Sequence, residues 1–568
     1  MRLTGGEILI ECLLEQGVDT VFGYPGGTIL NVYDSLYQRG RGKINHILTA
    51  HEQGASHAAD GYARSTGKVG VCFATSGPGA TNLTTGIATA FMDSSPVVFI
   101  TCNVGESLIG KDSFQECDTT GVTMPITKCN YLVKDVNELA SIVRAAFAMA
   151  KSGRPGPVVI DIVTNVTKEE AEYEPLPLEE HHNHGRLAMI MNRPTHNLRP
   201  HEPEGDIDKL VEMINESERP MLICGGGVVR GRAQAEFLEF AEKADAPVAI
   251  TIMGGGGFCG SNPLSTNMIG MHGSQASNMA VDACDLLIAV GCRFSERVTL
   301  DPNTFARNAK VVQIDIDRSE IDKNIKTAHH IVGDAKRVLE IANKKLTQQD
   351  HSKWKEYVFQ FPIETEYEEG GDTLTPKQVT DACSKIMPEK TIVATDVGQH
   401  QMWAIQHFRF TYPGQLLTSG GFGAMGFGLG AAIGAKAGNP DSTVLHFTGD
   451  GSFRMNFNEL GTEKFYNLPI ITIIMNNSVL GMVRQWQTLL YGERYSQTVL
   501  DRGPDFAKLA ESFGIRGVRV TNKADLEEAL QWAVDNNEGI VIDCAIDKDE
   551  MVRPMVPSGK NITNFIVD

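Results

Sequence analysis

The sequence lacks the features that mark secreted, membrane-spanning and nucleic-acid-binding proteins. Its first residues do not form a charged segment followed by an apolar core and a cleavage site, as a signal peptide would. No uninterrupted apolar run is long enough to span a membrane. There is no run of basic residues, and 70 acidic residues outnumber 51 basic ones to give a net charge of −19. This balance argues against nucleic acid or an anionic membrane surface as a partner.

Paired cysteines and a serine-protease type of triad are also missing. The eleven cysteines form no Cys-x-x-Cys pair, and several lie within apolar runs, where a reduced and buried thiol is the ordinary state. No Ser/His/Asp arrangement is recognisable in the sequence. We therefore expect a soluble cytoplasmic protein with reduced thiols.

Short apolar runs alternate with helical patterns in three stretches of the chain, the rhythm of doubly wound parallel α/β sheets. A length of 568 residues is enough for three or four domains, each with its own core. The expected strands are 20–22, 69–74, 97–101, 158–163, 220–224, 248–253, 286–290, 311–316, 391–397, 444–448 and 470–475. We expect α/β domains at 1–166, 206–345 and 376–568, the last with a C-terminal tail, and linkers at 167–205 and 346–375.

The first linker is acidic at its start and then rich in His, Asn and Pro. A histidine cluster can indicate a metal site, but the spacing here is irregular. A solvated connector is the favoured interpretation.

Two expected strands of the third domain end in polar residues. Gly449-Asp450-Gly451-Ser452 follows the strand at 444–448, and Asn477 follows the strand at 470–475, with a helix expected at 456–466 between them. Parallel strands place their carboxyl ends at one edge of a sheet, where open α/β sheets bind ligands. A carboxylate and an amide oxygen there suit Mg²⁺, and the loop amides suit a diphosphate. A lone Gly-Asp-Gly could also be a surface turn.

This stretch resembles the diphosphate–Mg²⁺ motif of thiamine-diphosphate enzymes. HEQGAxHAAxGYAR from His51 and TSGPGATN from Thr75 resemble the pyrimidine-binding domain of the same enzymes. There, the glutamate that matches Glu52 hydrogen-bonds N1′ of the aminopyrimidine, and a carboxyl group in an apolar site can share a proton with that nitrogen. Taken alone, Glu52 could be a carboxylate that the helix dipole stabilises.

Other motifs resemble the large, catalytic subunit of the acetohydroxyacid (acetolactate) synthase family. GMVRQW at 481–486 is close to specific for it, and MIGMHG at 268–273 with RFSER at 293–297 resembles its FAD-binding middle domain. FQE at 114–116 matches a substrate-side loop. Gly225-Gly226-Gly227 is a weak dinucleotide signal and could be a turn. The resemblance covers nearly the whole chain apart from the linkers.

The resemblance implies a role for each matching residue. The catalytic residues would be Glu52, Phe114 and Gln115. Thiamine diphosphate would contact Glu52, Gly398, Gln399, His400, Gly423, Met425, Gly451, Ser452 and Met482. The metal ligands would be Asp450, Asn477 and Val479. FAD would contact Arg154, Met271, His272, Arg293, Arg297, Asp315 and Asp334, and the substrates Arg297, Met482 and Trp486.

Three of these residues also have plainer interpretations. Met425 could be a core filler, whereas its family counterpart supports the bent cofactor. Trp486 could belong to a core or an interface, whereas its counterpart shapes the second-substrate pocket. Arg293 and Arg297 could be an exposed basic pair.

The resemblance implies a reaction and an assembly. Pyruvate would be decarboxylated on thiamine diphosphate, and the two-carbon fragment would add to pyruvate or 2-oxobutyrate. The products, 2-acetolactate or 2-aceto-2-hydroxybutyrate, serve branched-chain amino acid biosynthesis. A homodimer or homotetramer is implied, with Glu52 and Asp450 of one site on different subunits. A small regulatory subunit is common in the family.

Two departures from the family pattern affect the flavin contacts and the substrate channel. Thr164 stands where the family has lysine, and Ser295 stands in a segment that reads RFDDR in the family. Two other hypotheses stay open. One is a flavin-free acetolactate synthase or another 2-oxo-acid decarboxylase, and the other is an inactive nucleotide-binding homologue.

Overall fold

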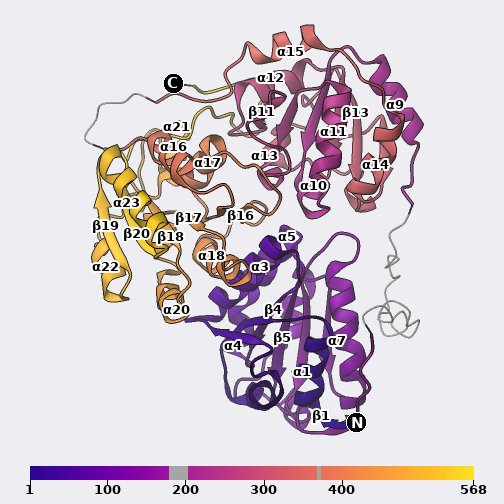
Figure 1. Ribbon diagram of the computed structural model, residues 1–568, viewed down its shortest axis with the longest axis vertical. Helices are drawn as coiled ribbons and strands as arrows, with labels where there is room; N and C mark the ends of the chain where they lie inside the picture. The colour runs from indigo at the N-terminus through magenta and orange to yellow at the C-terminus, as the bar shows by residue number, and fades with distance from the viewer. Residues whose placement is uncertain (178–201, 368–372, 568) are drawn as a thin grey trace.

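Three six-stranded parallel sheets, each flanked by helices, organise the chain (Figure 1). This computed structural model describes residues 1–177, 202–367 and 373–567. The expected class, three doubly wound α/β domains, is confirmed. The His/Asn/Pro-rich part of the first expected linker, 178–201, lies outside the described residues.

The N-terminal domain is built on the sheet β3-β2-β4-β5-β7-β6, whose neighbouring strands are all parallel. Its central strands are largely apolar and buried along their length, as a sheet covered on both faces requires. The strands are β2 (Thr20–Gly23), β3 (Asn45–Leu48), β4 (Gly70–Ala74), β5 (Val97–Asn103), β6 (Cys129–Val133) and β7 (Val158–Val163). The helices are α1 (Gly5–Glu15), α2 (Leu30–Ser35), α3 (Glu52–Thr66), α4 (Pro78–Asn82), α5 (Thr84–Met92), α6 (Thr119–Thr123) and α7 (Val136–Lys151). A short antiparallel pair, β1 (Arg2–Thr4) and β8 (Glu170–Glu172), joins the two ends of the domain.

The middle domain has the strand order β11-β10-β9-β12-β13-β14. Numbered within the domain, this order is 3-2-1-4-5-6, which is typical of dinucleotide-binding folds. The strands are β9 (Pro220–Cys224), β10 (Val248–Ile250), β11 (Ser265–Met268), β12 (Leu286–Val290), β13 (Lys310–Asp315) and β14 (His329–Val332). The helices are α9 (Ile207–Glu216), α10 (Gly226–Arg230), α11 (Gln234–Ala244), α12 (Gln275–Ala283), α13 (Glu296–Thr299), α14 (Ala335–Lys345) and α15 (Ser352–Phe359).

The C-terminal domain has the order β16-β15-β17-β18-β20-β19. Numbered within each domain, the N-terminal and C-terminal sheets share the order 2-1-3-4-6-5, although their sequences show no convincing repeat. The strands are β15 (Ile392–Thr395), β16 (Leu416–Thr418), β17 (Val444–Gly449), β18 (Ile471–Asn476), β19 (Arg516–Val520) and β20 (Ile540–Ala545). The helices are α16 (Pro376–Ile386), α17 (Gln399–His407), α18 (Phe427–Gly438), α19 (Asp450–Phe453), α20 (Leu460–Phe465), α21 (Gly481–Leu490), α22 (Phe506–Ser512) and α23 (Lys523–Asn536).

The N-terminal and C-terminal domains meet through α3 and α18, which lie side by side at the centre of Figure 1. Their backbones approach so closely that side chains are excluded at several positions. A Cβ at Gly434 would lie 1.8 Å from the carbonyl oxygen of Ala58, and one at Gly61 would lie 2.2 Å from that of Ala431. Small residues on both helices therefore determine how the two domains pack.

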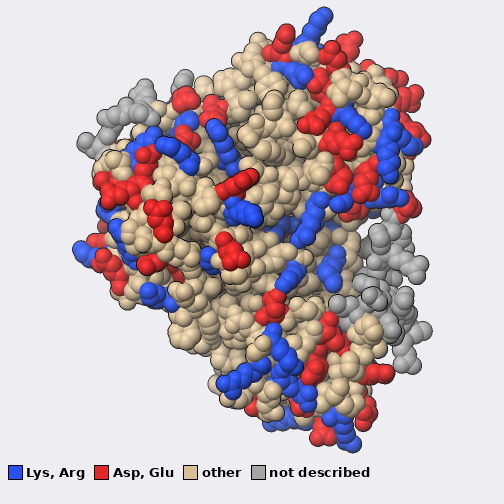
Figure 2. Space-filling model, viewed as in Figure 1, with Lys and Arg blue, Asp and Glu red and all other residues tan. Residues whose placement is uncertain are grey.

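The segment expected as the second linker contains a helix. Trp354 of α15 is buried in the middle domain's apolar cluster, and its indole N–H donates to the carbonyl of Pro220 at 2.8 Å. Residues 368–372 lie outside the described part of the chain. Among the described helices, none is long and apolar enough to cross a membrane. Acidic and basic side chains are interspersed over the face shown in Figure 2.

Candidate active site

A pocket of about 70 Å³ lies at the carboxyl edge of the C-terminal sheet. The chain leaves β15 toward β16 on one side and returns to β17 on the other, so β15 and β17 flank the point where ligands bind in open α/β sheets. The pocket is lined by Val397, Gly398, Gln399, His400, Trp403, Met425, Gly449, Asp450, Gly451, Ser452, Met475, Asn477, Val479, Leu480, Gly481, Met482 and Val483. It therefore contains all three expected metal ligands and most of the expected thiamine diphosphate contacts.

Among the buried polar atoms of the residues that line this pocket, Oδ2 of Asp450 and Nε2 of His400 have no hydrogen-bond partner in the described part of the chain. Burial raises the pKa of Asp450 to about 7 and lowers that of His400 to about 4. A buried carboxylate without a partner is costly unless a cation compensates it. The donor set therefore fits a hard cation beside a diphosphate, with Asp450 as the carboxylate ligand.

Asn477 is oriented by its neighbours. Its side-chain amide donates to Oε1 of Gln399 at 3.1 Å, and its Oδ1 accepts the N–H of Val479 at 3.2 Å. Gln399 donates in turn to Gln485 and to the carbonyl of Glu550. The pocket is thus tied to α21 and to the C-terminal tail.

Residues in and just after the Gly-Asp-Gly-Ser segment hold the turn that contains Met425 by hydrogen bonds. The N–H of Gly426 donates to Oγ of Ser452 at 3.1 Å, and Asn456 donates to the carbonyl of Gly426 at 2.7 Å. Met425 lines the pocket, and a Cβ at Gly451 would lie 3.8 Å from its terminal methyl. Gly423, two residues earlier in the same turn, has a φ of 74° and does not line the pocket.

A fully buried carboxylate beneath the pocket was not predicted from the sequence. Asp396 accepts the N–H of Gly428 at 2.7 Å and the hydroxyl of Thr448 at 2.6 Å, and His446 Nε2 lies 3.3 Å away. Burial works to raise its pKa, but these hydrogen bonds hold it at about 2. Asp396 directly precedes Val397 of the pocket and fixes the first turn of α18.

Glu52 lies elsewhere, at the first turn of α3. Its Oε2 accepts a hydrogen bond from the side-chain amide of Asn82 at 2.9 Å, and a Cβ at Gly79 would lie 3.4 Å from its Oε1. The two motifs of the N-terminal domain therefore meet at this carboxylate, and Asn82, the last residue of TSGPGATN, had been assigned no role from the sequence. Glu52 does not line the Asp450 pocket of the same chain.

The loop that contains Phe114 and Gln115 packs near this glutamate. Gln115 has a φ of 60°, and a Cβ at Gly77 would lie 2.8 Å from its carbonyl oxygen. The Phe114 side chain is 86% exposed. The structure thus brings the loop to the TSGPGATN turn, with its aromatic side chain toward solvent.

Several expected FAD contacts gather at the carboxyl edge of the middle sheet. Gly225 and Gly291 directly follow β9 and β12 at this edge, and a Cβ at Gly225 would lie 2.1 Å from the carbonyl oxygen of Gly291. Asp315 ends β13, and burial raises its pKa to about 6. An Nη atom of Arg293 would lie 3.2 Å from a Cβ at Gly421, so this edge adjoins the C-terminal domain.

The other expected FAD contacts are more dispersed. Arg154 pairs with Glu320 at 2.7 Å, Asp334 caps the N-terminus of α14, and Arg297 Nη1 lies 2.9 Å from Sδ of Met271. His272 is buried, and its carbonyl accepts from Gln406 at 2.9 Å.

Trp486 lies on α21 and packs, half-buried, against the middle domain's apolar cluster, which includes Met271 and Val298. Arg297, which contacts Met271, has a side chain that is 62% exposed. The structure therefore brings the expected substrate-binding residues Trp486 and Arg297 to the junction of the middle and C-terminal domains. This position of Trp486 is compatible both with a packing role and with a role in shaping the second-substrate pocket.

Of the two departures from the family pattern, Thr164 has a local explanation and Ser295 has none in the structure. Thr164, at the end of β7, donates its hydroxyl to the carbonyl of Asn103 at 2.6 Å, a bond that a lysine could not make in the same way. Ser295 is the N-cap residue of α13, but its side chain makes no capping hydrogen bond.

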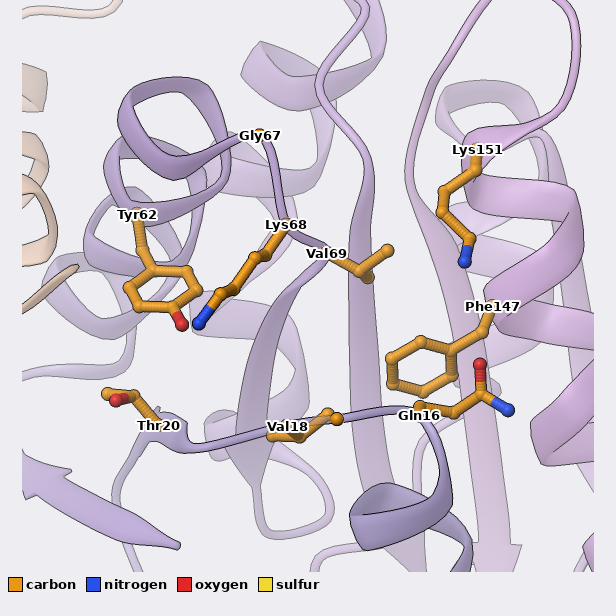
Figure 3. A pocket seen from close by; sticks show the side chains of 10 residues that line it. Gln16, Val18, Thr20, Tyr62, Gly67, Lys68, Val69, Phe147 and Lys151 are labelled. Atoms are coloured by element: carbon orange, nitrogen blue, oxygen red, sulfur yellow. The ribbon is translucent and has the colours of Figure 1, made fainter. Parts of the chain in front are cut away.

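A larger cavity, of about 290 Å³, lies at the amino ends of β2 and β4 in the N-terminal domain (Figure 3). Its lining includes Tyr62, Lys68, Phe147 and Lys151, and Lys68 pairs with Asp19. None of the expected site residues lines it. It lies at the sheet edge opposite to Glu52.

Comparison with known proteins identifies the class of protein. Residues 3–122, 207–341 and 396–544 match the N-terminal TPP binding domain, the central domain and the C-terminal TPP binding domain of thiamine pyrophosphate enzymes. The chain is therefore a thiamine pyrophosphate enzyme.

Similarity over the full length defines the family more closely. The chain is 44% identical to the probable acetolactate synthase large subunit of Methanocaldococcus jannaschii, over 99% of this chain and 95% of the relative. It is 43% identical to the acetolactate synthase isozyme 2 large subunit of Escherichia coli K12, over 99% of both chains. It is 44% identical to the acetolactate synthase large subunit of Cyanidium caldarium, over 99% of this chain and 96% of the relative. The chain belongs to the acetolactate synthase large-subunit family.

Proposed function

We propose that this chain catalyses the thiamine-diphosphate-dependent condensation of pyruvate with a second 2-oxo acid, giving 2-acetolactate from pyruvate and 2-aceto-2-hydroxybutyrate from 2-oxobutyrate. The observation that supports this most directly is the pocket at β15 and β17, where Asp450 Oδ2 has no partner among the described residues. Thiamine diphosphate, when bound, supplies the carbon nucleophile that attacks the 2-oxo carbon of pyruvate. The products belong to branched-chain amino acid biosynthesis.

The diphosphate and its cation are proposed to occupy the pocket. Asp450 would supply a carboxylate oxygen, Asn477 its amide oxygen and Val479 its backbone carbonyl, the hard oxygen ligands that Mg²⁺ prefers. The first N–H groups of α19 would face the diphosphate, since that helix begins at Asp450. Met425, which also lines the pocket, would support the ring system of the cofactor.

Glu52 is proposed to hold and release a proton at N1′ of the aminopyrimidine. Asn82 holds one carboxylate oxygen of Glu52, and α3, the helix that Glu52 begins, packs into an apolar cluster through its alanines. Because Glu52 does not line the Asp450 pocket of its own chain, each complete site would combine Glu52 of one subunit with Asp450 of another. The functional unit would then be a dimer or a dimer of dimers, related by two-fold symmetry.

FAD is proposed to bind along the carboxyl edge of the middle sheet, whose strand order suits a dinucleotide. Gly225 and Gly227 pack closely against Gly291 just after β9 and β12, and Arg293 lies beside the turn that leads to Met425. The relatives are named large subunits, so we also propose that a separate small subunit binds this chain.

One assay tests the proposal. The purified protein is incubated with pyruvate, thiamine diphosphate and Mg²⁺, and 2-acetolactate is measured. Bound flavin is measured on the same preparation by its absorbance after denaturation. Acetolactate with one flavin per chain supports the whole proposal, acetolactate without flavin supports a flavin-free synthase, and the absence of any carboligation product contradicts it.

A further inference from the structure

A fully buried carboxylate of the C-terminal domain reaches the segment that leads into α3. Glu459 ends the short 3-10 turn Phe457–Glu459, just before α20. Its Oε2 accepts the backbone N–H of Ala50 and its Oε1 accepts that of His51, both at 3.0 Å. Its side chain has no solvent exposure. Two consecutive amides of the N-terminal domain are therefore held by one carboxylate of another domain.

Neighbouring side chains complete this contact. Thr462 donates its hydroxyl to Oε2 of Glu459 at 2.6 Å, which orients the carboxylate. Upstream, the N–H of Leu48 donates to the hydroxyl of Tyr466 at 2.9 Å, at the end of β3. A Cβ at Gly54 would lie 2.1 Å from Oε1 of Glu459, so the carboxylate extends over the first turn of α3.

Packing alone does not explain a carboxylate at this place. Burial raises the pKa of Glu459, although Thr462 and the two amides oppose that rise by hydrogen bonding to the charged form. Removing a carboxylate from water is costly, and an apolar side chain would fill the same volume at lower cost. The carboxylate differs from such a side chain in one respect, since it fixes the direction of two peptide N–H groups.

Those two peptides lead directly to the start of α3. His51 is the N-cap residue of α3, with its Nδ1 accepting the N–H of Gln53 at 3.0 Å, and Glu52 is the first helical residue. A rotation of the peptides at Ala50 and His51 would therefore turn the first residue of the helix. Proton transfer is sensitive to such changes, since a misplacement of about 1 Å can cost ~10²-fold in rate.

We propose that Glu459 is a positioning residue for Glu52, which it aims by holding the amides of Ala50 and His51. This inference rests on the proposed function, because it takes Glu52 as the group that exchanges a proton with the cofactor. It also connects the two cofactor-binding motifs of one chain, since Glu459 belongs to the segment between Asp450 and Asn477. Within a dimer, these two motifs would serve different sites.

The test measures the proton-transfer step without turnover. Full-length protein is loaded with thiamine diphosphate and Mg²⁺ in D₂O, and exchange of the cofactor's C2 proton is followed by acid quench and NMR. Glu459→Gln keeps the shape of the side chain but presents an amide NH₂ to one of the two N–H donors. We expect its exchange rate to fall at least ~10-fold, and that of Thr462→Val, which frees the carboxylate, to fall ~2-fold to 5-fold.

Two further measurements separate positioning from stability. Affinity for thiamine diphosphate, read from quenching of tryptophan fluorescence, should change less than ~3-fold in both variants, because neither residue lines the diphosphate pocket. Tyr466→Phe is the matched control, since it removes a hydrogen bond at the same domain junction but upstream of the Ala50 and His51 amides. Its exchange rate should equal that of the wild type even where its melting temperature falls.

The outcomes are distinct. A wild-type exchange rate in Glu459→Gln overturns the inference, whatever its melting temperature. If Glu459→Gln does not fold, Thr462→Val decides, and an unchanged rate in that variant overturns the inference equally. A wild-type rate in Glu52→Gln would instead show that the proposed role of Glu52 is wrong, which separates failure of the proposed function from failure of this inference.

Discussion

Asn82 donates a hydrogen bond to the carboxylate of Glu52 at 2.9 Å, and this contact joins the two motifs of the N-terminal domain. Asn82 ends α4, which follows β4, and Glu52 begins α3, which follows β3. The two strands lie on either side of β2 in the sheet. The contact therefore forms at the carboxyl edge of the sheet, where the chain reverses its direction of winding.

The first prediction is that Glu52→Gln leaves the fold intact and removes most activity. The amide keeps the contact with Asn82 through its oxygen but cannot take up or release a proton. Loss of a proton-transfer group typically costs ~10²-fold to 10⁴-fold in rate. Acetolactate formation is measured at saturating cofactor, with circular dichroism as the control for folding. Near-normal turnover would show that Glu52 has another role.

The second prediction concerns the composition of each site. Glu52→Gln and Asp450→Asn are each expected to be nearly inactive alone. If Glu52 and Asp450 of one site come from different subunits, a mixed dimer contains one wholly wild-type site, and random exchange of equal amounts restores about a quarter of the sites. Activity is measured after dissociation and reassociation of the mixture, with each variant treated alone as the control. No recovery in a mixture shown to contain mixed dimers would place both residues of a site on the same chain.

The central strands could be predicted from the sequence because they are short, largely apolar runs between turns. β7, β9 and β12 have the expected bounds, and the other expected strands differ at their ends by at most three residues. In the three six-stranded sheets, the strands that were not predicted are the six at the edges, together with β20, and the short pair β1 and β8 was not predicted either. Edge strands such as β19, whose residues Arg516 and Arg519 are exposed, have no continuous apolar run that would mark them in the sequence.

The residues that line the candidate pocket could be predicted because they are contiguous motifs, such as the segment from Gly449 to Ser452. The residues that support them could not. Glu459 meets Ala50, and Asp93 accepts the N–H of Gly421, across separations of hundreds of residues. Only the packing of the domains brings such pairs together. That packing depends on where the backbones of two helices, such as α3 and α18, can approach each other closely.

The third prediction tests the close approach of α3 and α18. Gly434→Ala would place a methyl 1.8 Å from the carbonyl oxygen of Ala58, so α3 and α18 would have to separate. Overpacking of this kind typically costs about 1–3 kcal/mol. Gly461→Ala is the matched control, because it is also a helical glycine but its Cβ would lie 3.6 Å from the Phe513 ring, an ordinary contact.

The melting temperature is measured by calorimetry for both variants. Gly434→Ala should lower it, whereas Gly461→Ala should be neutral or stabilising by up to ~1 kcal/mol, since alanine favours the helix. Equal effects of the two substitutions would contradict the close-approach explanation.

The fourth prediction is a pH dependence of stability from Asp315. In the folded protein burial raises its pKa from 3.8 to about 6. Between these two values the folded state binds more protons than the unfolded chain, so the free energy of unfolding falls as the pH rises and the cost is complete above pH 6. The difference corresponds to roughly 3 kcal/mol at most.

Asp315→Asn should therefore raise the melting temperature of flavin-free protein at pH 7.5 by a few degrees and leave it nearly unchanged at pH 4. Asp317 is the control, because its substitution is expected to change the melting temperature in the opposite direction. Burial works to raise the pKa of Asp317, but hydrogen bonds from Ser319 and the charge of Arg154 hold it below its ordinary value. Asp317→Asn should lower the melting temperature at pH 7.5. A stabilising effect of both substitutions, or of neither, would show that the charge at Asp315 is not the cause.

The last prediction concerns the choice of second substrate. Trp486 packs beside Met271 and Val298 at the junction of the middle and C-terminal domains, so its indole can offer an apolar wall to an acceptor with one extra methylene. One methylene in such a pocket is worth about 1–3 kcal/mol, a ~10-fold to 200-fold preference. We expect 2-oxobutyrate to outcompete pyruvate as the acceptor in the wild type. Trp486→Leu should reduce that preference and spare acetolactate formation, because decarboxylation of the first pyruvate does not require the wall. A competition assay with both acids present reads the ratio of the two products directly, and an unchanged ratio in Trp486→Leu would assign the indole to packing alone.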